Sequence, residues 1–427
     1  MSAQIRRLWW LNPAWLFAAV VGSTILAAAL ESDDVYRLYG TPKYIDETHV
    51  VLAAVAIFVF ALGGRFEAAI AGAPEATPPE SRRVVRVWFW LTFGLALFGY
   101  VVWAGIGIKN GVSLDMLSGL FAEPGAEEIV RNELFPTLPG VTTCTHFSVP
   151  AVLLGLWLLG RGDRRVVWPL LLIFILAVAR ALLWRERSAV IALVVPGLVI
   201  WLRTWLCRPL SLFGRAGLQL GPVFAVVLLL LFFGGFEYFR SWQFYERDFE
   251  SYPEFTLWRV SGYFTTAHNN GAMALQTQSP LPLPYWTLRP LWKFPGFDQT
   301  SFAYEELAGF NPAVAHLDML ERYGTLELNN EGGLFMPVVD FGVAGSIAFW
   351  FGCGFVAGRL YRCFLAGTLA GLTLYPIVFL AILETPLILY IFFPASFPAF
   401  ATLLFAVWRA GRTPSVTAIP SPVPVIA

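Results

Sequence analysis

The sequence predicts an all-α, polytopic membrane protein with about ten transmembrane helices and one large extracytoplasmic loop. Composition is the first observation: the 427 residues are 57% hydrophobic and 14% charged, with a mean hydropathy of +0.64. Soluble globular domains carry about 25% charged residues, so a soluble class is excluded. Second, apolar segments of spanning length recur along the chain. Third, a long polar segment, residues 237–336, separates them and is rich in aromatic residues.

A spanning helix needs about 20 mostly apolar residues, and ten ranges meet this requirement wholly or in part. They are 9–30, 49–64, 84–105, 140–160, 166–184, 188–202, 216–236, 337–358, 364–383 and 385–408. The first range follows Arg6 and Arg7 and contains Ala27 and Ala29, which imitate a signal-peptide cleavage site. Because the run is long enough to span and further spans follow, we expect an uncleaved first helix.

The arginines predict the orientation of these spans. With ten spans, the clusters that flank them fall on one side, and the positive-inside rule makes this side cytoplasmic. The clusters are Arg6/Arg7, Arg65/Arg82/Arg83, Arg161/Arg164/Arg165, Arg203/Arg208/Arg215, Arg359/Arg362 and Arg409/Arg412. Both termini are then cytoplasmic, and the segment 237–336 lies on the opposite side. Omitting one span would scatter the clusters over both faces.

The chain therefore divides into four parts. Residues 1–236 form transmembrane helices 1–7, residues 237–336 the large outer loop, and residues 337–412 transmembrane helices 8–10. Residues 413–427, rich in Pro, Ser and Val, are expected to be a disordered cytoplasmic tail. In the eighth span, Gly354 and Gly358 are spaced as a close-packing face for another helix.

Arginines near the outer ends of the spans are the candidate anion site. Arg180 lies within the fifth span, where an ionisable group is costly and therefore a functional candidate. Arg185 and Arg187 follow across a tight turn, and Arg240 lies at headgroup level after the seventh span. Each guanidinium offers a bidentate fork that suits a diphosphate. Alternatively, these side chains extend to the interface or pair with Glu186. The arginines assigned to diphosphate binding are Arg180, Arg185, Arg187, Arg240, Arg247 and Arg259.

Aromatic residues of the large loop are candidates for glycan binding, because their faces pack against the C–H faces of sugars. The residues assigned to this role are Trp242, Tyr245, Tyr263 and Trp286. The alternative is that they fill a small core, as aromatic side chains commonly do.

Three residues are candidate general bases. His268 lies in an Asn- and Gly-rich stretch that predicts a polar turn, and its titration range suits proton transfer, although a lone loop histidine is often structural. Glu331 precedes the eighth span, and Asp340 lies one to two turns inside it. The sequence has no His/Cys cluster with metal-ligand spacing and no Asp-x-Asp pair in the loop, so no metal and no cofactor are expected.

Several short motifs then carry a family resemblance. They are the first outer loop Tyr36-Arg-Leu-Tyr-Gly-Thr-Pro-Lys43-Tyr44, the hairpin ending Arg187-Ser-Ala-Val, and Asn329-Asn330-Glu331 followed by Asp340-Phe-Gly-Val-Ala-Gly345. With the layout of the spans and the long loop, they resemble the oligosaccharide repeat-unit polymerases, the Wzy-type O-antigen and exopolysaccharide polymerases. The resemblance covers most of the chain in layout. The short fifth–sixth hairpin departs from members that carry a second large outer loop.

This resemblance implies a GT-C-like, metal-independent glycosyltransferase in the bacterial inner membrane, with its active face periplasmic. Such enzymes transfer a growing glycan from undecaprenyl diphosphate to the terminal sugar of another lipid-linked repeat unit. The arginines would hold the diphosphate and stabilise the leaving group, and His268, Glu331 or Asp340 would deprotonate the acceptor hydroxyl. The implied partners are the lipid-linked oligosaccharide donor and acceptor, membrane lipid and a candidate chain-length regulator, with no nucleic acid.

Other functions remain open. A polyprenyl-phosphate-sugar transferase would place acidic pairs in the first outer loop, where Asp33 and Asp34 follow Glu31, and would require Mg²⁺ or Mn²⁺. An O-antigen ligase has a similar layout and differs in its acceptor. A lipid-linked oligosaccharide flippase is the non-enzymatic alternative. It predicts charges throughout the membrane interior, whereas here they gather at the outer face.

Overall fold

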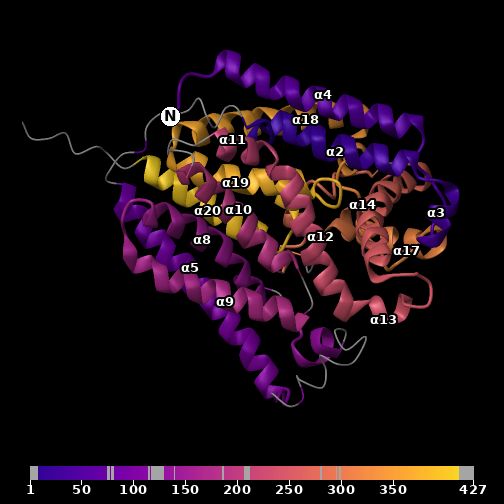
Figure 1. Ribbon diagram of the computed structural model, residues 1–427, viewed down its shortest axis with the longest axis horizontal. Coiled ribbons are helices and arrows are strands. Elements are labelled where there is room, and N and C mark those ends of the chain that lie inside the picture. Colours follow the sequence, from indigo (N-terminus) through magenta and orange to yellow (C-terminus); the bar gives the residue numbers. More distant parts are fainter. Residues whose placement is uncertain are drawn as a thin grey trace, which may run out of the picture.

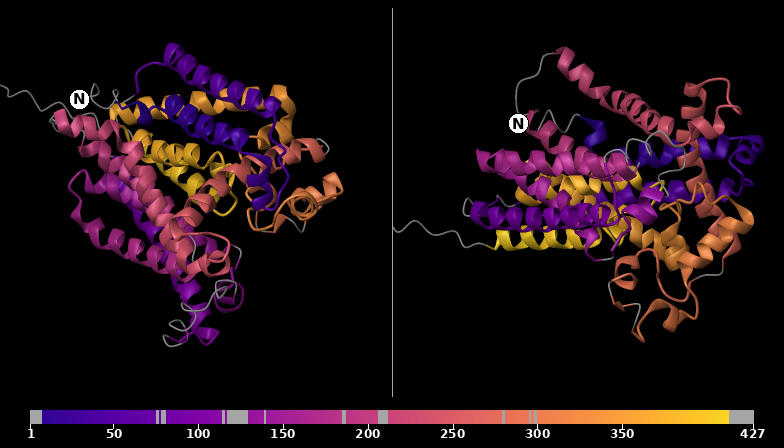
Figure 2. Two further views of the ribbon diagram at one scale, coloured as in Figure 1. Left: turned by 45° about the vertical axis from the view of Figure 1, so that its right-hand side comes forward. Right: turned by 90° about the horizontal axis from the view of Figure 1, so that it is seen from below.

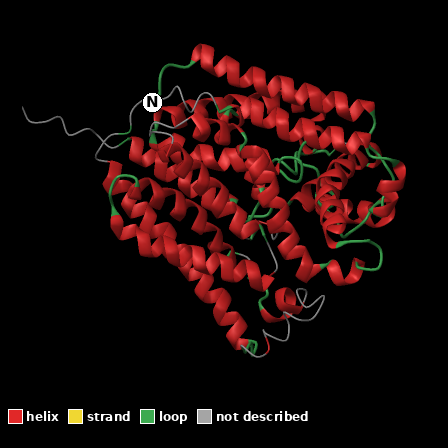
Figure 3. Cartoon of the chain, in the orientation of Figure 1, coloured by secondary structure: helices red, strands yellow, loops and turns green. Residues whose placement is uncertain are grey.

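The computed structural model describes residues 8–74, 77, 81–113, 116, 129–138, 140–184, 187–205, 212–278, 281–294, 296–297 and 300–412. Every regular element in these ranges is a helix, and no strand occurs among them (Figures 1 and 3). The prediction of an all-α protein is therefore confirmed for the part of the chain that is described. The expected tail, residues 413–427, lies outside the described residues.

Seven helices are long and apolar enough to cross a membrane. They are α2 (Pro13–Leu30), α4 (Glu47–Ile70), α5 (Ser81–Lys109), η3 with α8 (Thr142–Phe147 and Ser148–Leu159), η4 with α9 (Arg164–Val166 and Val167–Trp184), α12 (Gly221–Arg240) and α18 (Met336–Ala366). Three shorter apolar helices are α10 (Ser188–Trp205), α19 (Leu369–Glu384) and α20 (Phe397–Gly411). Helices thus lie in all ten predicted ranges, while the ten-span topology stays a prediction.

The remaining helices are short, except for one. The short ones are η1 (Trp9–Leu11), α3 (Asp33–Leu38), η2 (Val130–Leu134), α11 (Leu212–Gln219), α13 (Trp242–Tyr245), α15 (Arg289–Trp292), α16 (Tyr304–Ala308), α17 (Pro312–Tyr323) and η6 (Tyr390–Phe392). The exception is α14 (Tyr252–Thr277), which has 26 residues. Helices α13, α14 and α17 gather at one end of the bundle (Figures 1 and 2).

Two local predictions are wrong. The stretch around His268 is not a turn, because it lies well inside α14. The last predicted range, 385–408, begins too early: α19 ends at Glu384 and α20 begins at Phe397, with only η6 between them. Pro386 and Pro394 fall in this interval, where proline cannot donate to a helical ladder, and Pro398 takes a first-turn position in α20.

Helix α14 forms because its start is well capped and its polar residues find partners. The hydroxyl of Ser251 accepts from the backbone N–H of Glu254, and Pro253 lies in the first turn. The helix packs against α2 and α12. Its second half buries apolar residues such as Met273 and, beside them, a polar run, namely Thr265, Thr266, His268, Asn269 and Asn270.

Helices α4 and α18 pack most closely of all, and they lie side by side at the top of Figure 1. A Cβ at Gly354 would collide with the backbone carbonyl of Phe60, and one at Gly358 would lie 2.9 Å from the Cα of Gly64. Only residues without a side chain allow this approach. The predicted close-packing face of Gly354 and Gly358 is therefore confirmed.

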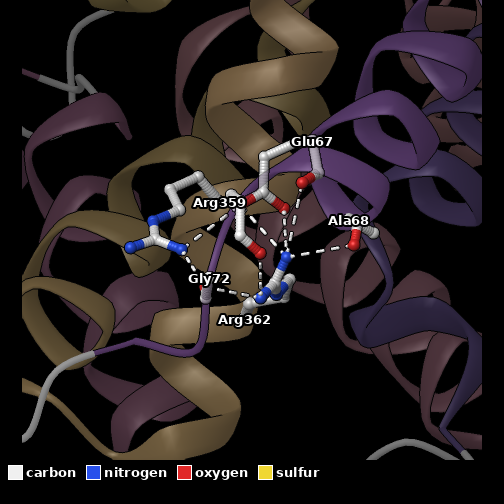
Figure 4. A network of polar contacts seen from close by, with 6 residues as sticks. Glu67, Ala68, Gly72, Arg359 and Arg362 are labelled. Carbon is white, nitrogen blue, oxygen red and sulfur yellow. Dashed lines mark hydrogen bonds and ion pairs between the residues drawn. The ribbon is translucent and has the colours of Figure 1, made fainter.

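Charged residues fix the same helix pair at one end (Figure 4). Glu67 of α4 is fully buried, and its carboxylate lies 3.5 Å from Arg359 and 3.4 Å from Arg362 of α18. Both arginines also donate to the carbonyl of Gly72, each at 2.8 Å. The ends of α4 and α18 are thus joined by two guanidiniums that share one buried carboxylate.

Helix α18 is interrupted near its other end. Gly342 has φ +67° and ψ −178°, which is not helical and which L side chains rarely adopt. The break separates a short N-terminal turn of α18, which contains Asp340, from the long part that packs on α4. A small apolar hollow lies beside it, lined by Leu52 of α4, Trp350 of α18 and Phe335, the residue before α18.

Candidate functional site

Glu237 is the centre of a buried polar cluster at the end of α12. Its side chain is 0% exposed, yet it accepts from four donors. Arg187 Nη1 lies 2.8 Å from Oε1, and Arg259 Nε lies 3.3 Å from Oε2. The hydroxyls of Ser241 and Tyr263 donate to it at 2.8 and 3.4 Å. Burying a carboxylate is costly unless it is paired and hydrogen-bonded, and here both conditions hold.

Arg259 joins this carboxylate to a second one. Its side chain is 1% exposed, and Nη2 lies 2.7 Å from Oε1 of Glu327. The phenol of Tyr245 donates to the other oxygen of Glu327 at 2.6 Å. Burial alone would lower the pKa of Arg259, but Tyr263, Glu237 and Glu327 raise it above its usual range, so the guanidinium stays charged.

Aromatic rings line both arginines. The guanidinium of Arg187 lies 3.4 Å from the ring centroid of Phe233 and 5.0 Å from that of Tyr263. Arg259 lies 5.4 Å from the centroid of Tyr263 and 5.8 Å from that of Tyr245. Burial and the neighbouring Glu327 raise the pKa of Tyr245 to about 12. The rings exclude water from the guanidiniums and hold them by cation–π contact.

The cluster is electrically compensated as it stands. Glu384 of α19 also interacts electrostatically with Arg187. Arg187 therefore faces the Glu237 carboxylate and the Glu384 carboxyl group, and Arg259 faces the carboxylates of Glu237 and Glu327. An anion that binds here has to replace a carboxylate, because the guanidinium charges are already matched. Arg259 Nη1, which is buried and has no hydrogen-bond partner among the described residues, offers one further donor.

The structure distributes the other predicted arginines differently. Arg180 is buried, donates to Thr145 Oγ1 at 3.2 Å and lies 4.3 Å from the ring centroid of Trp184. These partners belong to neither α12 nor α14. Arg247 is exposed on the segment between α13 and α14. Arg185 lies outside the described residues, and only the backbone of Arg240 is described, at the end of α12.

His268 faces α2 rather than the Glu237 cluster. Its ring is fully buried, and Nε2 lies 2.9 Å from the hydroxyl of Thr24. Nδ1 has no hydrogen-bond partner among the described residues. Burial lowers the pKa of His268 to about 3, so the imidazole is neutral near pH 7. Its geometry resembles that of a packing residue between two helices.

The two asparagines after His268 fasten loops to α14. The side-chain amide of Asn269 donates to the carbonyl of Pro42 and accepts from the backbone N–H of Tyr44, both at 2.7 Å. Asn270 donates to the carbonyls of Leu328 and Asn330 at 2.8 and 3.0 Å. The second pair of bonds holds residues 325–332, named here the strap, across α14.

The strap carries both Glu327 and Glu331, whose carboxylates bind different arginines. Glu327 binds Arg259, whereas Glu331 Oε1 lies 2.6 Å from Arg289 Nη1. At the end of the strap, Gly332 has φ +75° and its N–H donates to the carbonyl of Leu387. A Cβ there would collide with the carbonyl of Ala267, so the close approach to α14 requires glycine.

Asp340 anchors a turn of the polar segment. Its two oxygens accept from the backbone N–H groups of Tyr285, Trp286 and Thr287 at 2.9, 3.1 and 2.7 Å. The hydroxyl of Thr287 adds a fourth bond at 2.7 Å. All of these groups are buried, so the carboxylate is occupied by the protein itself.

The predicted glycan-binding aromatics differ in exposure. Tyr245 and Tyr263 are half-buried and belong to the Glu237 cluster. Trp242 is half-buried and packs on Tyr252 at a centroid distance of 5.3 Å. Trp286 is buried against the ring of His316. Trp286 therefore fills the small core of the polar segment.

The sequence reasoning missed Glu237 and Glu327. Glu237 ends an apolar run, which is the place expected for an interfacial charge, so its burial is not visible from hydropathy. A signal was available in its spacing, because Glu237 and Ser241 are four residues apart and hydrogen-bond to each other. Glu327 lies in the strap, two residues before the Asn329-Asn330 motif.

Among the described residues, no three His, Cys, Asp or Glu side chains gather as a metal-binding group. The arrangement that these residues do provide is a buried arginine pair with compensating carboxylates and aromatic walls. No protein-family model, no curated protein and no solved structure matches this chain.

Proposed function

We propose that the protein is a membrane glycosyltransferase that polymerises undecaprenyl-diphosphate-linked oligosaccharide repeat units on the periplasmic side of a bacterial inner membrane. The observation that carries this proposal is the convergence of Arg187 and Arg259 on Glu237 at the end of an apolar helix. Two guanidiniums at this position suit the diphosphate of a lipid carrier whose tail remains in the membrane. In the transfer, the acceptor hydroxyl attacks the anomeric carbon, and the arginines stabilise the diphosphate that leaves.

The environment of α12 supports a lipid-linked substrate. Its residues Val223, Phe224, Val226, Val227 and Leu228 are 49–65% exposed. Since successive helical residues point about 100° apart, this run exposes apolar side chains around the whole helix. A hydrocarbon tail that lies along α12 reaches the cluster where the helix ends, at Glu237.

Exposure discriminates between the candidate bases. Asp340 is occupied by four donors, and His268 is fully buried. Glu331 retains 14% exposure of its side chain and has Arg289 as its ion-pair partner. We therefore favour Glu331 as the base, with His268 and Asp340 holding the surrounding elements in place.

The proposed topology follows the arginine distribution: ten spans, cytoplasmic termini and the helices α13–α17 on the periplasmic face. The gathering of these helices at one end of the bundle supports this arrangement (Figure 2). The donor and acceptor would both be lipid-linked oligosaccharides, with a chain-length regulator as a further partner.

Deleting the gene in its host and separating lipid-linked and surface glycans on a gel tests the function. A polymerase predicts that single repeat units accumulate on their carrier and that the long-chain ladder disappears. Long chains that persist on the carrier without reaching their final acceptor would instead identify a ligase. Unchanged glycans would contradict both and leave transport or another sugar transfer.

Complementation with arginine variants tests the site. We expect Arg187→Ala and Arg259→Ala to abolish the ladder, and lysine at either position to rescue poorly because it lacks the fork. Arg322→Ala is the matched control, since Arg322 is exposed on α17. Membrane insertion of each variant is checked by immunoblotting of membrane fractions. Normal ladders from both alanine variants would refute the assignment of the diphosphate to this cluster.

A further inference from the structure

The carboxylates of Glu237 and Glu327 compensate the two arginines of the cluster, and they are not equivalent. The side chain of Glu237 is 0% exposed and lies under Arg187, Arg259, Ser241 and Tyr263. The side chain of Glu327 is 45% exposed, although the arginine that it binds is 1% exposed. Glu327 therefore reaches from the surface to the buried guanidinium, and it is the member of the cluster that solvent can readily solvate.

The backbone beside Glu327 is fixed independently of its carboxylate. Asn270 of α14 holds the carbonyls of Leu328 and Asn330, and Glu331 binds Arg289. Rotation of the Glu327 side chain away from Arg259 consequently leaves the strap in place. The energetic requirement is that another anion satisfies the donor that Glu327 leaves, the buried Arg259 Nη2, whereas the half-buried Tyr245 hydroxyl can be satisfied by water.

A phosphate oxygen meets this requirement better than the carboxylate does. A diphosphate offers more acceptor oxygens than one carboxylate, and Arg259 Nη1 has no partner among the described residues. We infer that Glu327 is an exchangeable counter-ion, which occupies the oxyanion position of Arg259 and is displaced by the diphosphate of the lipid-linked substrate. This inference rests on the proposed function. Glu327 thereby keeps the buried guanidinium compensated when no substrate is bound, and competition with it limits the affinity for diphosphate.

Binding of two probes to the full-length protein in nanodiscs tests the exchange. Inorganic pyrophosphate probes the charge alone, and farnesyl diphosphate probes a lipid-linked diphosphate. In Glu327→Gln the carboxylate no longer competes with the probe for Arg259. Because the lost ion pair is partly exposed, we expect the Kd for each probe to fall about fivefold. Glu321→Gln is the matched control, because Glu321 is exposed on the neighbouring helix α17, and its Kd values should equal those of the wild type.

Tyr245→Phe provides a second test that leaves Glu327 itself unchanged. Removing the phenol loosens the hold on the carboxylate, so the Kd for both probes should fall by about twofold. Arg259→Gln should weaken binding more than tenfold. Thermal unfolding and size-exclusion profiles establish that each variant is folded before its Kd is measured.

The outcomes separate the inference from the function. Unchanged or weaker binding in both Glu327→Gln and Tyr245→Phe, with Arg259→Gln still defective, would refute the exchange while leaving the proposed function intact. Tighter binding of pyrophosphate but not of farnesyl diphosphate would also refute it, because the inferred ligand is lipid-linked. Tighter binding of both probes supports the inference even if the gene deletion reveals a ligase.

Discussion

Replacing Glu237 by glutamine removes the negative charge that two buried arginines share. The carboxylate lies 2.8 Å from Arg187 Nη1 and 3.3 Å from Arg259 Nε, with no exposed surface. Removing one partner of a buried ion pair costs about 3–5 kcal/mol, since the remaining charge is left uncompensated. Glutamine keeps one oxygen that accepts from Ser241 or Tyr263, so we expect the lower end, a loss of about 3 kcal/mol in the free energy of unfolding.

The stability loss is measured by unfolding the purified protein from mixed micelles with increasing denaturing detergent. Glu321→Gln makes the same chemical change at an exposed position and should alter the free energy of unfolding by less than about 0.5 kcal/mol. In the deletion host, Glu237→Gln should also shorten or abolish the glycan ladder, because the guanidiniums lose their common anchor. A loss below about 1 kcal/mol together with a normal ladder would show that Glu237 does not position the arginines.

Three further predictions concern the scaffold around the cluster. Gly354→Leu should prevent α18 from packing on α4 and reduce the amount of protein in the membrane, measured by immunoblotting, whereas exposed Gly352→Leu should be tolerated. Asp340→Asn leaves fewer acceptor sites for the four groups that donate to this side chain, so we expect a loss of about 2 kcal/mol in the free energy of unfolding and faster proteolysis near Thr287. Unchanged proteolysis would contradict the anchoring role. Burial lowers the pKa of His268 to about 3, so the unfolded state binds more protons between about pH 6.5 and 3, and the free energy of unfolding falls as the pH falls through this window. His268→Gln should reduce this pH dependence, as measured by unfolding temperatures at pH 7 and 5.

Hydropathy and small-residue spacing could predict the helices of the bundle. Helices occur in all ten predicted ranges because a long apolar run has few alternatives to a helix. The face formed by Gly354 and Gly358 was also predictable, since close helix packing there depends on the spacing of two glycines along one helix. The interval between α19 and α20 was harder to predict. Proline occurs both after the end of a helix and in its first turn, and the sequence alone does not distinguish the two positions.

The polar segment could not be predicted from local sequence, and α14 shows why. An Asn- and Gly-rich stretch ordinarily favours a turn because asparagine side chains bond their own backbone. Here the amides of Asn269 and Asn270 bond the backbone of residues 42–44 and of the strap instead. The tertiary fold brings these distant partners to α14. Because the asparagine amides are satisfied by them, a stretch that would favour a turn in isolation forms the buried face of a helix.

The same limitation applies to the site. Arg180, Arg187 and Arg259 look alike in sequence, but only contacts across helices reveal that Arg187 and Arg259 share Glu237, while Arg180 contacts Thr145 and Trp184. Proximity to the expected membrane surface was the reason for predicting a role for all three. Which arginines meet could not follow from their positions along the chain, because it depends on how the start of α10, which follows Arg187, packs against α12 and α14.

The interruption of α18 at Gly342 has a mechanical consequence. The long part of the helix is held against α4 by close backbone packing at its glycines and by the ion pairs of Arg359 and Arg362 with Glu67. It therefore has little freedom to move relative to α4. The N-terminal turn is bonded instead to the polar segment, through the backbone N–H groups that Asp340 accepts from. A non-helical residue between them interrupts the helix, so the two parts need not move as one rigid body. For the proposed glycosyltransferase, a movement of this turn during turnover would therefore not have to bend the part of α18 that packs on α4.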